Sequence, residues 1–238
     1  MTAPKPKIVV HVPHAALVIP DEARADFLLP WPEVEAEAWT SADLWTDRLA
    51  REAWPEATIL EARVSRIVVD VERFEDDAAE DMARRGRGVL YTDTHLGMPL
   101  RSQLGPAQRA DLLARYYRPH WADLAAAARD AVLIDLHTYP AEAWPIEPTP
   151  DADRPEIDLG VDPDLTPEPW CRELEAHFRG AGFTVGINTP YAGVIDAGAR
   201  AAVMIEIRRD VLGSPDRAGP WARVVRALSG MPIPGAPS

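Results

Sequence analysis

Residues 8–20 read IVVHVPHAALVIP. Ile8 to Val10 form an uninterrupted β-branched run, which is typical of a strand that is buried on both faces of a sheet. Pro13 cannot donate to the hydrogen-bond ladder of a sheet, so we expect the strand to end there. The stretch therefore predicts a central β-strand whose end delivers His14 to a site.

Other apolar runs of the same character follow along the chain, at 57–62, 65–71, 130–137, 183–188 and 201–208. Several are apolar at successive positions, as in parallel strands that are covered on both sides. Helix-like segments lie between them, at 32–54, 105–130, 167–182 and 214–230. This alternation predicts an α/β fold: a three-layer α/β/α sandwich with a mainly parallel mixed sheet.

The chain has 238 residues and no stretch that resembles a linker, so we expect one catalytic domain over residues 1–238. Residues 138–162 hold many of the 24 prolines and show no periodicity. Such a segment is too long for an ordinary connection, and it predicts an irregular functional loop over the edge of the sheet.

The charge balance and the cysteine content exclude several classes of protein. The net charge of −13 does not favour binding to nucleic acid or to an anionic membrane, which are both negatively charged. A single cysteine, Cys171, rules out a disulfide framework and a cysteine-rich zinc finger. Residues 1–7 do not lead into a signal peptide, and no apolar run approaches the roughly 20 residues of a membrane helix. We expect a cytoplasmic protein, from a bacterium to judge by its many alanines and arginines, of unknown oligomeric state.

Polar residues gather where the predicted strands end. Ligands of open α/β sheets bind outside the carboxyl ends of the strands. The residues at or near these ends are His14, Asp70, Arg73, Asp135, His137, Asn188, Tyr191, Glu206 and Arg208. We expect them to converge on one site.

Two of these residues, His14 and His137, come from different strands. Together with a carboxylate they would make a zinc site that leaves one position open, as catalytic zinc requires. Asp135 precedes His137 by two residues, so both point to the same side of a strand, and Asp135 could accept the second N–H of that histidine. We expect His11 to have a structural role and His120 to pack in the core or on the surface.

Arg66 and Arg73 flank a buried run that contains Asp70. The planar guanidinium group matches a carboxylate, so these arginines suit a carboxylate-bearing substrate. The alternative is an ion pair with one of the neighbouring aspartates at 70, 76 and 77.

Glu206 lies inside the apolar run VMIEIR. A carboxylate on a buried strand is costly unless it is paired or functional. Next to a metal-activated water it would act as a general base and then as a general acid. Asn188, Tyr191 and Arg208, from neighbouring strand ends, are expected to bind the substrate.

The ordered set of motifs resembles the N-formylglutamate amidohydrolase family, which is related to zinc carboxypeptidases and aspartoacylase-like deacylases. The motifs are VPHAALVIP, SADLWTDRLA, VSRIVVDVERF, LIDLHTYP, DLGVD, INTPYAGVI and VMIEIRRD, and they run from about residue 8 to 210. The resemblance implies a phosphorylase/hydrolase-like sandwich. It also implies that Zn²⁺ and a metal-activated water cleave the amide bond of an N-formyl or N-acyl amino acid.

The resemblance further implies the ligands of the metal. His14 and His137 would be the histidine ligands, and Asp43 in SADLW would supply the third, with Glu22 and Asp47 as alternatives.

The remaining roles follow from the same resemblance. Glu206 is similar to the catalytic glutamate of zinc carboxypeptidases, and Arg66 is a second candidate for binding the substrate carboxylate or for stabilising the oxyanion. Arg73 would bind the substrate carboxylate, while Asp135 and Asp70 would hold the metal ligands in place from behind.

The sequence also departs from the family pattern. The family motif D-x-N-R is here Asp70-Val71-Glu72-Arg73, so Glu72 replaces an asparagine that helps to hold a substrate carboxylate. A negative charge there would repel a glutamate-like substrate. Leu17 also stands where related deacylases carry a glutamate. The alternatives are therefore a peptidase or peptidoglycan-type amidase on this scaffold, or a non-catalytic ligand-binding protein with an altered site.

Overall fold

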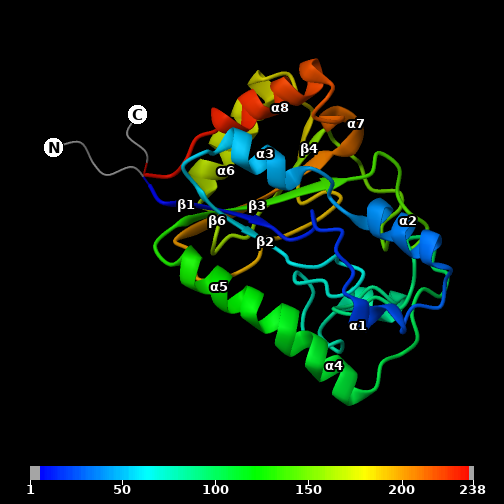
Figure 1. Cartoon of the computed structure of the whole chain (residues 1–238). Helices are drawn as coiled ribbons and strands as arrows, with labels where there is room; N and C mark the ends of the chain where they lie inside the picture. Colours follow the sequence, from blue (N-terminus) through cyan, green and yellow to red (C-terminus); the bar gives the residue numbers. More distant parts are fainter. Residues whose placement is uncertain (1–5, 236–238) are drawn as a thin grey trace.

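A six-stranded sheet with strand order β2-β1-β3-β6-β4-β5 forms the centre of the computed structural model, which describes residues 6–235 (Figure 1). The strands are β1 (Ile8–Val12), β2 (Thr58–Glu61), β3 (Val132–Tyr139), β4 (Ile157–Gly160), β5 (Val185–Ile187) and β6 (Ala201–Arg208). Strands β2, β1, β3 and β6 pair in parallel, whereas β4 is antiparallel to β6 and parallel to β5. The mainly parallel mixed sheet is confirmed.

Helices cover the sheet on both sides. The helices of the described residues are α1 (Asp21–Arg24), α2 (Trp31–Ser41), α3 (Thr46–Ala53), the 3-10 helix η1 (Asp81–Arg85), α4 (Pro106–Leu112), the π-helix η2 (Leu113–Tyr117), α5 (Arg118–Ala128), α6 (Glu168–Gly180), α7 (Arg209–Leu212) and α8 (Ala218–Ser229). Helices α3, α6 and α8 lie on one side of the sheet and α5 on the other, so the three-layer architecture is confirmed as well (Figure 1).

Alternate residues of the central strands supply two apolar cores. Val10 and Ile134 face the cluster that includes Phe178 of α6, whereas Leu133 faces the cluster that includes Leu124 of α5. Successive side chains of a strand point to opposite faces, so a continuous apolar run is what a doubly covered strand requires. This packing fixes the carboxyl ends of β1, β3 and β6 side by side at one edge.

One predicted strand is wrong. Residues 65–71 form turns, although Ile67 and Val69 are fully buried. Their side chains pack in a third apolar cluster with Val34 of α2 and with Tyr91, beyond the carboxyl edge of the sheet. A β-branched run looks the same in sequence whether a sheet or a set of irregular segments buries it.

The irregular loop predicted over 138–162 is correct only in its middle part. Strand β3 continues to Tyr139, and β4 occupies Ile157–Gly160. Because β4 runs against β6, the paired strand β5 is reversed too. This reversal decides where the residues that follow β5 lie.

The long helical segment predicted over 105–130 is built from α4, η2 and α5 in succession. The π-turn η2 lies just before Pro119. Proline lacks an N–H and displaces the carbonyl one turn earlier, so the hydrogen-bond pattern changes there.

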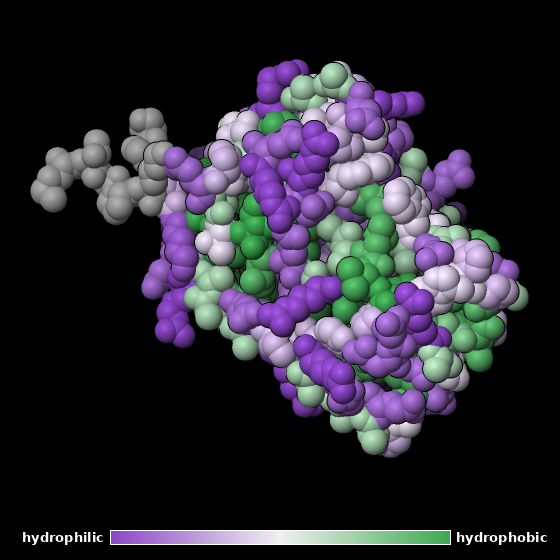
Figure 2. All heavy atoms as spheres, viewed as in Figure 1, coloured by the Kyte–Doolittle hydropathy of each residue, from purple (hydrophilic) through white to green (hydrophobic). Residues whose placement is uncertain are grey.

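Figure 2 shows a face on which hydrophilic side chains alternate with smaller hydrophobic areas. Within residues 6–235, no helix has the length and apolar character needed to cross a membrane. Residues 1–5, which belong to the N-terminal stretch considered for a signal peptide, lie outside the described residues.

Candidate active site

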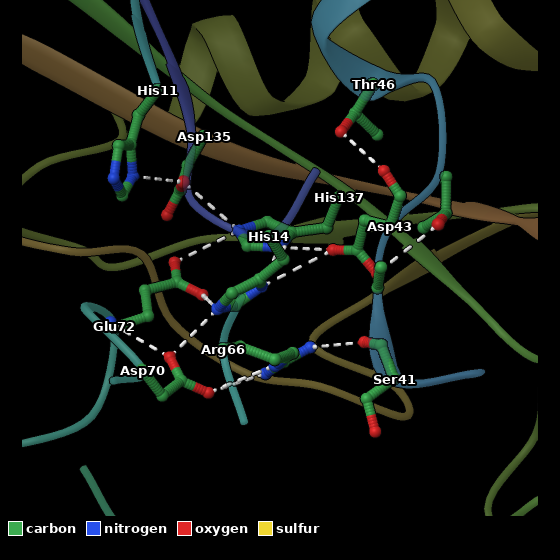
Figure 3. A network of polar contacts seen from close by, with 12 residues as sticks. His11, His14, Ser41, Asp43, Thr46, Arg66, Asp70, Glu72, Asp135 and His137 are labelled. Atoms are coloured by element: carbon green, nitrogen blue, oxygen red, sulfur yellow. Dashed lines mark hydrogen bonds and ion pairs between the residues drawn. The ribbon is translucent and has the colours of Figure 1, made fainter. Parts of the chain in front are cut away.

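Three buried side chains from separate elements meet at the carboxyl edge of the sheet (Figure 3). His14 follows β1, His137 lies on β3, and Asp43 lies in the connection between α2 and α3. The connection turns because Trp45 has a positive φ of 65°. The backbone N–H of Asp43 donates to the carbonyl of His14 over 2.9 Å, which holds the connection against the end of β1.

The three side chains present one ligand atom each to a common point. The Nδ1 atoms of His14 and His137 are 3.3 Å apart. The Oδ2 atom of Asp43 lies 3.4 Å from the first and 3.1 Å from the second. In a tetrahedral zinc site with bonds of about 2.0–2.1 Å, ligand atoms are about 3.3 Å apart. The three ligand atoms are therefore spaced as the ligands of one metal ion.

The opposite nitrogen atoms of the two imidazoles are engaged by carboxylates. His14 Nε2 lies 2.8 Å from Asp70 Oδ1, and His137 Nε2 lies 3.1 Å from Asp135 Oδ1. A carboxylate that accepts the Nε2–H of a neutral histidine leaves the Nδ1 lone pair free for a metal. Asp70 and Asp135 therefore contact the histidines on the side opposite the two Nδ1 atoms.

Glu72 also contacts both histidines. Its Oε1 atom is 3.0 Å from His137 Nε2, and its Oε2 atom is 3.7 Å from His14 Nε2. Ligand atoms of His14, Glu72 and His137 all lie within 4.8 Å of one another, so Glu72 is a second candidate for the carboxylate ligand. The sequence indicated Glu72 only as a departure from the family motif.

The site attracts positive charge. Burial alone would raise the pKa of Asp43, but hydrogen bonds with His137 and His14 hold it well below its usual range. Burial would likewise lower the pKa of His137, but the neighbouring carboxylates of Glu72 and Asp135 raise it well above the usual value. The carboxylates therefore favour a cation between the histidines, whether a proton or a metal ion.

Glu206 lies next to this group on β6, where it is the register partner of His137. Its side chain is buried, and its Oε2 atom has no hydrogen-bond partner among the described residues. Burial raises the pKa of Glu206 to about 8. A buried, unpartnered carboxyl group of this kind is a candidate for proton transfer.

Two arginines approach Asp70 from the other side. Arg66 donates from Nε and Nη2 to Asp70 Oδ2, over 3.1 and 2.9 Å. Arg73 is further away, with its Nε atom 3.8 Å from Asp70 Oδ2. The hydroxyl group of Tyr91 donates to the same Asp70 oxygen over 2.5 Å. Burial would raise the pKa of Asp70, but Arg66 and His14 hold it well below its usual range. Arg66 therefore forms the ion pair with Asp70 that the sequence offered as the alternative to substrate binding. Its side chain also lines the cavity described next.

A cavity of about 840 Å³ opens onto these groups. The predicted site residues that line it are His14, Asp43, Arg66, Arg73, Asp135, His137, Tyr191 and Glu206. The middle of the Pro-rich loop also lines it, through Trp144, Ile146 and Glu147. The loop therefore lies over the site, as the sequence indicated.

Asn188 and Arg208, predicted to bind substrate, lie away from the cavity as the described residues form it. Asn188 follows the reversed strand β5, and its amide group bridges the backbone of Val161 and the N–H of Gly193. Arg208 is held by Asp210 and by the carbonyl of Arg154. Their placement gives no support for substrate binding.

The alternative third ligands do not reach the metal position. Glu22 is exposed on α1 and accepts the hydroxyl of Tyr116. Asp47 lies on α3 and pairs with Arg51. Both belong to the surface of the protein.

The sequence did not single out two cavity residues. Arg209 donates to the backbone carbonyls of Thr40 and Ala42, and to Asp43 Oδ1 over 3.2 Å. The second such cavity residue is Trp144, whose ring centre lies 5.4 Å from the guanidinium carbon of Arg209. The motif VMIEIRRD contains two adjacent arginines, and no local pattern tells which of them turns inward.

A buried chain of hydrogen bonds continues behind Asp135. His11 Nδ1 is 2.8 Å from Asp135 Oδ1, and His11 Nε2 is 2.8 Å from His120 Nε2 on α5. Burial lowers the pKa of His120 to about 3, so its imidazole is neutral. The structural role expected of His11 is therefore to hold Asp135 from the side opposite His137.

Replacing His11 by alanine is expected to lower the free energy of unfolding by about 3 kcal/mol, because Asp135 and His120 each lose a buried partner. Urea denaturation would measure this loss. His11→Asn is the matched control, since its amide can still donate to Asp135, and it should recover at least half of the loss. Equal stability of His11→Ala and the unmodified protein would contradict the expectation.

Comparison with known proteins agrees with this arrangement. The sequence matches the N-formylglutamate amidohydrolase family over residues 7–212. No curated protein matches it. The structure is similar to an N-formylglutamate amidohydrolase from Ralstonia eutropha JMP134, with a TM-score of 0.75, 23% identity, and coverage of 95% of this chain and 91% of that chain. It is also similar to gene product Atu2144 from Agrobacterium tumefaciens, with a TM-score of 0.73, 20% identity, and coverage of 95% and 89%.

The two structural likenesses establish the fold, and the family match spans most of the chain. It includes His14, Asp43, His137 and Glu206. The chain therefore belongs to the N-formylglutamate amidohydrolase family, and it is an enzyme that hydrolyses amide bonds.

Proposed function

We propose that the protein is a zinc-dependent amidohydrolase that removes the acyl group of a small N-formyl or N-acyl amino acid. The observation that carries this proposal is the spacing of three ligand atoms, on His14, His137 and Asp43, at 3.1–3.4 Å from one another. Glu206 lines the same cavity. A metal position next to a buried carboxyl group is what hydrolysis by an activated water requires.

The two histidines and Asp43 would hold the metal. Zinc bound there supplies a Lewis acid, which polarises a carbonyl group and lowers the pKa of a water molecule. Asp43 is favoured over Glu72 as the third ligand because Asp43 faces both Nδ1 atoms, whereas Glu72 faces nitrogens that already contact Asp70 and Asp135. Glu72 is then a hydrogen-bond acceptor behind His137.

The other groups divide the chemistry among them. Glu206 accepts the proton of the attacking water and returns it to the leaving nitrogen. Arg66, oriented by Asp70, donates to the developing oxyanion. Arg73 binds the substrate carboxylate, since it lines the cavity and its Nε has no hydrogen-bond partner among the described residues.

Removal of the metal tests this proposal. Purified protein treated with a strong chelator and then desalted is expected to lose essentially all hydrolysis of N-acyl amino acids. One equivalent of Zn²⁺ should restore it, because the ligand residues survive chelation. The measurements are metal content by mass spectrometry and the rate of amine release. Full activity in metal-free protein would exclude the proposed mechanism.

A further inference from the structure

We infer that the substrate carries a single carboxylate and a bulky apolar group, and that the enzyme discriminates against N-formylglutamate, which carries two carboxylates. This inference rests on the proposed function and specifies its substrate class. It follows from how many cationic donors in the cavity are free, from the acidic groups beside them, and from the apolar wall next to Glu206.

Four arginines line the cavity within residues 6–235: Arg66, Arg73, Arg87 and Arg209. Three of them use their N–H groups within the protein. Arg87 is buried and donates to Glu37 and to Ser41 Oγ, over 3.1 and 3.0 Å. Arg209 donates from its two Nη atoms to Thr40, Ala42 and Asp43, and only its buried Nε has no partner among the described residues, so it offers no pair of free N–H groups. These donors are already part of the wall and cannot clamp a second carboxylate.

Arg66 is committed in a similar way. Two of its nitrogens bond Asp70, and the third, Nη1, lies 3.5 Å from the carbonyl of Ser41. Its one weakly held nitrogen is the donor that we assign to the oxyanion. It therefore has no pair of free N–H groups for bidentate binding of a carboxylate.

Arg73 is the exception. Its side chain is 29% exposed, as is that of Arg209, but its nearest acidic atom, Asp70 Oδ2, lies 3.8 Å from Nε, beyond hydrogen-bond distance. Neither Nη atom has a hydrogen-bond partner among the described residues, and Nε is also unpartnered. The cavity therefore offers one free guanidinium fork, which matches one carboxylate.

Acidic groups make a second carboxylate unfavourable. Glu72 is adjacent to Arg73 in the chain and lines the cavity, as do Glu206 and Asp196. Glu147 also lines it but is neutralised by Arg154 over 2.8 Å. A glutamate side chain would place a second carboxylate beside these acidic groups, and no free guanidinium of the described residues would replace the hydration that this carboxylate loses.

Part of the cavity lining is apolar. Met204 precedes Glu206 by two residues on β6, so both point to the same side of the sheet. Val194 and Ile195, from the loop after β5, line the cavity together with Trp121 of α5. These four side chains form an apolar wall, and burying an apolar group against it is favourable.

A panel of N-formyl amino acids with the zinc-loaded enzyme tests the inference. We expect kcat/KM for N-formylleucine and N-formylphenylalanine to exceed that for N-formylglutamate at least tenfold. Equal or better hydrolysis of N-formylglutamate would overturn the inference and leave the proposed function intact. If no N-acyl amino acid in a wider panel is hydrolysed, the proposed function fails and the inference with it.

Two variants test whether Arg73 is the single carboxylate donor. Arg73→Gln should raise KM for N-formylleucine at least tenfold, with a smaller effect on kcat. It should leave kcat/KM for the uncharged N-formylleucinamide within threefold. Arg129→Gln, an exposed arginine that precedes β3 at the opposite edge of the sheet, should match the unmodified enzyme. An unchanged KM for N-formylleucine in Arg73→Gln would show that another group binds the carboxylate.

Discussion

His137→Ala is expected to abolish both metal binding and amide hydrolysis. His137 supplies one of the three proposed ligand atoms, 3.1 Å from Asp43 and 3.3 Å from His14. Groups that only hydrogen-bond to metal ligands typically change affinity by about 10- to 100-fold, so loss of a ligand should exceed that range. Metal content after dialysis and the rate of amine release measure the two losses.

His177→Ala is the matched control for this variant. His177 lies on α6 and bonds the carbonyl of Ala227, so it belongs to the helical layer and not to the cavity. It should keep the metal and its activity. The ligand assignment would be wrong if His137→Ala retained one equivalent of zinc and the rate of the unmodified enzyme.

The central part of the site was predictable because its residues follow apolar runs that the sequence marks as buried parallel strands. A buried parallel strand delivers the residue at its carboxyl end to a common edge, and this rule located His14, His137 and Glu206 at one cavity. The same rule failed for Asn188. Strand β5 runs antiparallel to β6, and the direction of a strand in a mixed sheet is set by tertiary pairing that no local pattern records.

The strand predicted at 65–71 failed for a related reason. Ile67 and Val69 are as buried as any strand residue, but the segments that bury them are α2 and the chain around Tyr91. A run of residues must be apolar wherever it is buried. Whether it forms a strand depends on whether a neighbouring strand or an irregular segment packs against it. Even so, the segment brings Asp70 to 2.8 Å from His14 and pairs Arg66 with Asp70.

Glu72 shows what a single departure from a motif can mean in three dimensions. In the sequence it was a negative charge in place of an asparagine. In the structure its carboxylate contacts His137, and burial together with the nearby Asp135 raises its pKa. Its proposed consequence for the substrate depends on Arg73 being the one free guanidinium among the cavity residues that the structure describes, which no local sequence pattern predicts.

Glu206→Gln is expected to keep the metal and lose turnover. The amide has nearly the same shape as the carboxyl group, and Glu206 is not among the proposed ligands, so metal content should equal that of the unmodified enzyme. Glutamine cannot accept and return a proton, and loss of a general base typically lowers kcat by about 10²- to 10⁴-fold. Stopped assays at saturating substrate, with zinc measured on the same samples, would separate the two effects.

The physical basis of this second prediction is the environment of Glu206. Burial raises its pKa to about 8 in the protein alone, and a nearby divalent cation would lower that value and favour the carboxylate, the form that accepts a proton. Asp196→Asn removes a carboxylate from the rim of the same cavity and should keep kcat within threefold. If Glu206→Gln also stayed within threefold, the proton would have to pass through another carboxylate, and Glu72, 3.0 Å from His137, would be the residue to test next.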